Sequence, residues 1–190
     1  MRSFDPRAVG RRECRAWETY YRREWPAFLA ASVGLVHAAF GMPWWRTLVG
    51  AWLVLRANQV WAPYPNNDPE AAQRLMTRFY QLLRKSTGES FQPTHAAWLE
   101  VEWWRVHREA QHAEGSGPSE ELTEALRNLY AYSYSVDPAE VRPAAALRAE
   151  AMDVSDRWVE DGCDPDDSRL ARERALLVRS YASLLAAVHR

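Results

Sequence analysis

Four Asp-Pro pairs are the feature of this sequence that most restricts its fold. They stand at Asp5-Pro6, Asp68-Pro69, Asp137-Pro138 and Asp164-Pro165. An Asp side chain accepts hydrogen bonds from the free amides at a helix start, and proline suits the first helical position, where its missing N–H costs nothing. Each pair therefore predicts the beginning of a helix.

Apolar residues that recur at steps of three and four extend this prediction over the whole chain. The stretch from Tyr130 to Val136 comes closest to strand alternation, but it continues the helical pattern of the preceding leucines, so we interpret it as a frayed helix end. After Asp137 a short turn is expected before the main helix, which Pro143 would begin. Glycines 88, 115, 117 and 162 are expected to mark stops. The predicted helices lie near 6–24, 26–41, 43–61, 69–86, 94–113, 118–134, 143–161 and 167–189.

The length and composition indicate one domain. The chain has 190 residues, 47% of them hydrophobic, which is enough for one sizeable core. We therefore predict an all-α, single-domain bundle of seven or eight helices over residues 1–190, with a core rich in its 10 Trp. Isoleucine is absent and Lys85 is the one lysine among 24 basic residues, a bias that fits a GC-rich bacterial coding sequence.

Charge and cysteine usage point to a cytoplasmic protein. Cys14 and Cys163 lack the spacing of redox or zinc sites, and the first 25 residues contain no stretch of signal-peptide type.

Arginines and aromatic residues alternate in the predicted first helix, but glutamates in the same helix reduce its positive charge. With a sequence pI near 6.5 this argues against nucleic acid as a partner.

The run from Pro26 to Trp45 has the length of a membrane span and contains no charged residue. His37, several weakly hydrophobic alanines and the interruption Gly41-Met42-Pro43 argue against a span. The sequence therefore favours a buried core helix here and argues against a membrane partner.

The predicted helix 43–61 is apolar around most of its circumference, so we expect it to lie at the centre of the bundle. Arg56 and Gln59 share a side with Trp52, which would place a guanidinium in an aromatic environment. A buried charge needs an anion, either a Glu of another helix or a ligand carboxylate or phosphate. The Pro-rich loop that follows could form the mouth of a pocket. The candidate ligand-binding residues are Arg56, Gln59, Trp52, His37 and Tyr64.

The predicted helix 94–113 carries a second candidate site. Glu109 and His112 have the Glu-x-x-His spacing of carboxylate-bridged di-iron bundles, and Glu102 lies two turns earlier. No second Glu-x-x-His occurs in the chain, and Arg105 is placed to form surface ion pairs with both glutamates. A metal site at Glu102, Glu109 and His112 stays an alternative to these ion pairs.

The same helix has a second apolar side formed by Trp98, Val101 and Trp104. Either neighbouring helices enclose it, or it meets a second copy of the chain in a homodimer. The leading function is thus a helical protein that holds a small apolar or anionic ligand or associates with itself. The alternatives are a cofactor-independent enzyme with Arg56, Gln59 and His37 in an aromatic pocket, and the metal protein. The sequence identifies neither catalytic residues nor a cofactor.

Overall fold

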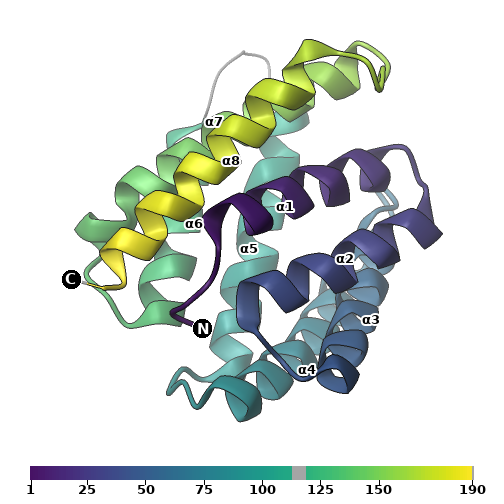
Figure 1. Cartoon of the computed structure of the whole chain (residues 1–190). Helices are drawn as coiled ribbons and strands as arrows, with labels where there is room; N and C mark the ends of the chain where they lie inside the picture. The colour runs from purple at the N-terminus through teal and green to yellow at the C-terminus, as the bar shows by residue number, and fades with distance from the viewer. Residues whose placement is uncertain (113–118, 190) are drawn as a thin grey trace.

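The fold is all-α, as predicted. A computed structural model describes residues 1–112 and 119–189, and these contain eight helices and no strand (Figure 1). The predicted stops at Gly115 and Gly117 lie outside the described residues. The helices are α1 (Pro6–Tyr21), α2 (Trp25–Phe40), α3 (Trp44–Trp61), α4 (Pro69–Thr87), α5 (Pro93–His112), α6 (Glu120–Tyr134), α7 (Pro138–Glu160) and α8 (Ser168–Ala187).

Three of the four Asp-Pro pairs begin helices, which confirms that part of the prediction. The side chains of Asp5, Asp68 and Asp137 accept hydrogen bonds from backbone amides of the first helical turn, at 2.9, 2.8 and 2.7 Å. The proline of each pair is the first residue of its helix. The caps therefore fix the starts of α1, α4 and α7.

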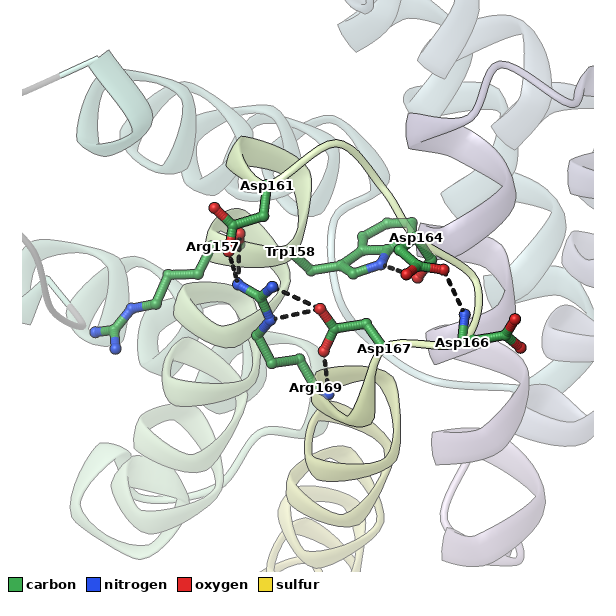
Figure 2. A network of polar contacts seen from close by, with 7 residues as sticks. All are labelled: Arg157, Trp158, Asp161, Asp164, Asp166, Asp167 and Arg169. Carbon is green, nitrogen blue, oxygen red and sulfur yellow. Dashed lines mark hydrogen bonds and ion pairs between the residues drawn. The ribbon is translucent and has the colours of Figure 1, made fainter.

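The fourth pair forms a turn instead of a helix start (Figure 2). The indole of Trp158 donates to the carbonyl oxygen of Asp164 at 2.6 Å, and the Asp164 side chain accepts from the Asp166 amide at 3.0 Å. Helix α8 begins at Ser168, and its N-cap Asp167 accepts from the Arg169 amide at 2.7 Å. Asp164 thus closes the turn between α7 and α8, and Asp167 caps α8.

Arg169 ties the same turn to the end of α7. Its guanidinium contacts the carboxylates of Asp167 and Asp161 at 2.5 and 2.6 Å and donates to the Arg157 carbonyl at 2.8 Å. Hydrogen bonds from Arg169 lower the pKa of the Asp167 carboxyl. These contacts fix the turn of the α7–α8 hairpin (Figure 2), and α7 and α8 also pack on each other along their lengths.

Two boundary predictions need correction. Helix α7 begins at Pro138, and Pro143 lies inside it, because a proline near a helix start removes a single backbone hydrogen bond. Helix α6 does not fray at its tyrosines. It continues to a buried Tyr134, and Ser135 in the left-handed conformation ends it by donating its amide to preceding carbonyls.

The helices close a ring. Each helix packs mainly on the next one along the chain, and α8 packs on α1, so that the first and last helices complete the circle. Figure 1 shows α1 lying between the α7–α8 hairpin and α2. A ring of helices has an interior that every member can reach, and this interior contains the site described below.

The core is rich in tryptophan, as predicted. Ring centroids of Trp61 and Trp104 lie 5.9 Å apart, those of Trp104 and Trp103 6.1 Å, and those of Trp103 and Trp17 6.0 Å. This tryptophan chain runs from α3 through α5 to α1. Aromatic pairs at such separations stabilise a core beyond the area that they bury.

The predicted central position of α3 is wrong. Its large apolar side chains Trp44, Trp45, Leu48, Val49 and Trp52 are between 46% and 61% exposed, and we call them the outer face of α3. The opposite side of α3 packs on α2 and α4. An apolar circumference therefore does not prove that a helix is enclosed. One apolar side of α3 has no neighbour within the single chain.

The acid-free run 26–45 is divided between α2 and α3 by the predicted turn at Gly41, whose φ is +59°. Only Phe28, Ser32 and Val36 of α2 are buried, so this helix covers the bundle on one side and is not a core helix. Among the described residues no helix combines the length and the hydropathy needed to cross a membrane.

Candidate functional site

A cavity of about 200 Å³ lies inside the ring, and all eight helices contribute to its wall. We call it the central cavity. Its wall is mainly aromatic and aliphatic, with Trp17, Phe40, Phe79 and Trp103 among the lining residues. Two acidic residues and one arginine also line it. The wall therefore combines a large apolar surface with a few charged groups.

The charged pair of the central cavity joins α1 to α7. Arg148 donates from Nε and Nη2 to Oε1 of Glu13, at 3.0 and 2.5 Å. Glu13 is 3% exposed and Arg148 9% exposed, so the pair is removed from solvent. Burial is the largest single effect and lowers the pKa of Arg148, but Glu13, Tyr130, Tyr181 and Glu100 together outweigh it and raise that pKa well above its usual value. The guanidinium also lies 5.0 Å from the centre of the Trp103 ring.

Aromatic donors complete the bonding of Glu13. The Tyr181 hydroxyl donates to Oε2 at 2.5 Å and the Trp17 indole to Oε1 at 3.3 Å, while Arg148 Nη1 donates to the Tyr130 hydroxyl at 3.3 Å. Burial raises the pKa of both tyrosines, which keeps their hydroxyls protonated. Glu13 and Arg148 thus sit in a closed network, and neither is a free charge.

A second carboxyl group lies on the α5 side of the cavity. The Tyr80 hydroxyl donates to Oε2 of Glu100 at 2.6 Å. Burial raises the pKa of Glu100, although Tyr80, the charge of Arg148 and the nearby indoles of Trp103 and Trp104 act in the opposite direction. Glu100 is therefore an acid without an arginine of its own, held in place by a tyrosine.

Two polar groups of the wall have no hydrogen-bond partner. They are the indole N–H of Trp103 and the hydroxyl of Ser133, and the two side chains belong to residues that are 2% and 6% exposed. A buried polar group without a partner costs about 1–3 kcal/mol. Such groups in a cavity wall are able to bond to a molecule that enters the cavity.

The predicted ligand-binding residues do not line this cavity. Arg56 is exposed and bonds to Gln59 at 2.6 Å, so its predicted burial is wrong. Trp52 lies on the outer face of α3. The error follows from the misplaced α3, because Arg56 and Gln59 share its solvent side. The neighbours Val54 and Asn58 do reach the central cavity.

His37 and Tyr64 pack against other aromatic rings. His37 stacks on Trp44 with ring centroids 4.1 Å apart, and its Nδ1 is buried without a hydrogen-bond partner. Tyr64 is 56% exposed and stacks on His112 at 4.1 Å. The structure brings neither residue to Arg56 or to the central cavity, and a shared pocket of Arg56, Gln59 and His37 is absent from the described part of the chain.

The predicted ion pairs on α5 are present. Arg105 contacts Glu102 at 2.6 Å and Glu109 at 2.5 Å, and it lowers the pKa of the Glu102 carboxyl. His112 donates from Nδ1 to its own helix, at the Arg108 carbonyl, at 2.7 Å. In residues 1–112 and 119–189 no three potential metal ligands lie together. The three residues of the predicted metal site thus have protein partners.

The charged residues of the central cavity were missed by the sequence analysis, although the sequence contains a signal for them. Glu13 falls on the apolar stripe of α1, Glu100 on that of α5, and Arg148 among the alanines of α7. A charge within a helical stripe predicts an internal partner, but not which one, since Glu13 and Arg148 are 135 residues apart. In comparisons with known proteins, no family model, no curated protein and no solved structure matches this chain.

Proposed function

We propose that this protein binds a small, mainly apolar molecule in the central cavity. The size of the cavity carries this proposal. Dry apolar cavities of about 150 Å³ bind benzene, and the central cavity of about 200 Å³ is somewhat larger. A single ring with a short substituent therefore fits.

The free energy of an empty interior also favours an occupant. Void volume in an enclosed core costs about 24 cal/mol per Å³, and this cavity is partly open to solvent, so leaving it unfilled costs at most about 5 kcal/mol. Whole domains are stable by about 5–15 kcal/mol. Water can bond to the few polar groups of the wall, but it finds no partners along the aromatic and aliphatic side chains that form most of it. A ligand that fills the space recovers part of this loss as binding free energy.

Titration with ethylbenzene and acetophenone tests the proposal. We expect at least one of them to bind to the full chain, with chemical-shift changes at the tryptophan indoles that line the cavity. Ala39→Phe is the matched blocking variant, since Ala39 is a half-buried residue of the wall and a ring there extends into the void. Failure of both probes to bind, or equal binding to folded Ala39→Phe, would refute the proposal.

Self-association is a second candidate function, favoured by the outer face of α3. Five large apolar side chains are exposed there on one helix, whereas exposed apolar groups on monomers are normally scattered. The charges at its edges have partners: Arg46 donates to the Lys85 carbonyl and the Ser86 hydroxyl, and Arg56 to Gln59. These acceptors are neutral, so a two-fold contact between two such faces must keep both guanidinium groups at its solvent-exposed rim.

The surface predicted for a homodimer from sequence was a different one. Val101 and Trp104 of α5 are buried within the chain, and only Trp98 of that trio is exposed. We expect Leu48→Glu on α3 to give a monomer in analytical ultracentrifugation, and Trp98→Glu to leave the mass unchanged. A wild-type protein that is monomeric at high concentration would rule this candidate out.

A further inference from the structure

The unpartnered groups of the central cavity define what kind of ligand it takes. The Trp103 indole N–H can only donate, and the Ser133 hydroxyl can donate or accept. The Trp103 indole N–H interacts with the Glu100 carboxyl and lowers its pKa, but its geometry falls short of a regular hydrogen bond. Both groups are buried in the wall of a cavity that is otherwise mostly apolar. A ligand oxygen would satisfy a donor that the protein leaves unsatisfied.

The charges of the wall select against an anion. Arg148 is the one arginine among the lining residues, and Glu13 neutralises it through two hydrogen bonds. Glu100 adds a second carboxyl group to the wall. Among the described lining residues an anionic ligand would thus meet two carboxyl groups and no arginine free of a carboxylate, and two neutral donors compensate little of the desolvation of a charge.

We propose that the ligand of the central cavity is a neutral ring compound with one carbonyl or hydroxyl oxygen, which accepts a hydrogen bond from the Trp103 N–H or the Ser133 hydroxyl. This inference rests on the proposed function and narrows it. The ring packs among the aromatic side chains, with Phe40 and Phe79 on the apolar side of the wall. The oxygen gives the orientation, because a small number of polar groups fixes a ligand in an apolar pocket.

Four probes of similar size separate the alternatives: ethylbenzene without oxygen, acetophenone with a carbonyl, benzoate as an anion and benzylammonium as a cation. Calorimetric titration of the full wild-type chain should give acetophenone the highest affinity, about tenfold above ethylbenzene, since a site with unpaired donors rejects analogues that lack the acceptor. Benzoate should bind most weakly. Tightest binding of ethylbenzene, benzoate or benzylammonium would overturn the inference.

Variants of the two donors locate the contact. Ser133→Ala and Trp103→Phe each remove one donor, and at least one of them should reduce the preference for acetophenone over ethylbenzene to about twofold or less. Ser133→Thr keeps the hydroxyl and serves as the matched control. An unchanged preference in both folded donor variants would contradict the assignment. If neither ethylbenzene nor acetophenone binds, the proposed function itself fails, whereas equal binding of these two probes refutes only the inference about the oxygen.

Discussion

At the scale of single residues, the Glu13–Arg148 pair is the interaction whose loss should cost most. Removing one partner of a buried ion pair leaves an uncompensated charge and costs about 3–5 kcal/mol. We expect Glu13→Gln to lower the free energy of unfolding by that amount in urea titrations, because the guanidinium of Arg148 stays buried.

Two further variants complete this test. The double substitution Glu13→Gln with Arg148→Met should recover most of the loss, since it removes both charges. Glu102→Gln breaks the exposed pair with Arg105 and should cost less than about 1 kcal/mol. Equal effects of Glu13→Gln and Glu102→Gln would show that the pair is not buried in solution.

Glu173 on α8 gives the stability of the protein a pH dependence. It is 1% exposed and neither carboxyl oxygen has a hydrogen-bond partner. Burial raises its pKa to about 9, the charges of Glu13, Glu18 and Asp156 add to this, and Arg174 opposes it. In the unfolded chain a glutamate titrates near 4.3. Between these two values the folded state therefore holds one proton more than the unfolded state.

Stability must then fall as the pH rises through this window, by up to about 1.4 kcal/mol per pH unit. We expect Glu173→Gln to remove this contribution, so that the variant gains on the wild type between about pH 5.5 and pH 7.5 in urea unfolding, by on the order of 2 kcal/mol. Glu160→Gln makes the same change at an exposed position of α7 and should not alter the pH dependence. Parallel curves of unfolding free energy against pH for Glu173→Gln and wild type would show that Glu173 does not cause the pH dependence.

At the scale of elements, the contact between α1 and α8 depends on Gly10. A Cβ added to Gly10 would lie 2.7 Å from the amide nitrogen and 2.9 Å from the Cα of Val178, both main-chain atoms that cannot turn away. We expect Gly10→Ala to destabilise the protein by about 1–3 kcal/mol, measured as a lower midpoint in thermal unfolding.

Gly34 in α2 is the matched control. A Cβ there would meet Nη1 of Arg12 at 2.6 Å, the far end of a flexible side chain. Gly34→Ala should therefore be tolerated and should stabilise the helix by up to about 1 kcal/mol through its higher helix propensity. Opposite signs for the two substitutions are expected, and a stabilising Gly10→Ala would mean that α1 and α8 lie farther apart.

The helices themselves could be predicted, because the sequence patterns that indicate them lie within a few residues of each other. Caps at Asp5, Asp68 and Asp137 act within one turn, and apolar periodicity reports the helix between them. Asp164 misled the prediction, because an Asp that caps a helix and an Asp that closes a turn use the same hydrogen bonds to nearby amides.

The placement of α3 could not be obtained in this way. Hydrophobic periodicity shows which residues avoid water in some assembly, but not whether the neighbour belongs to the same chain. The apolar circumference of α3 therefore predicted a central helix, and one half of it is exposed in the single chain. Arg56 and Gln59 were misplaced together with it.

At the scale of the whole molecule, the candidate site depends on closure of the helix ring. Its polar contacts join residues 135 and 168 positions apart, and no spacing in the sequence reports such pairings. The central cavity is even harder to predict from the sequence, because it is the space that the packed side chains of all eight helices leave unfilled. The sequence predicted the number of helices and the aromatic core, while the site arises from their arrangement.

The tryptophan chain from Trp61 to Trp17 has an optical consequence. Indoles at these separations pass excitation to one another faster than they emit, so light absorbed by any member is shared along the chain. Three of its four members line the central cavity. A quenching molecule held there would therefore lower the emission of these four of the 10 tryptophans together, and that fraction of the intrinsic fluorescence would report whether the cavity is occupied.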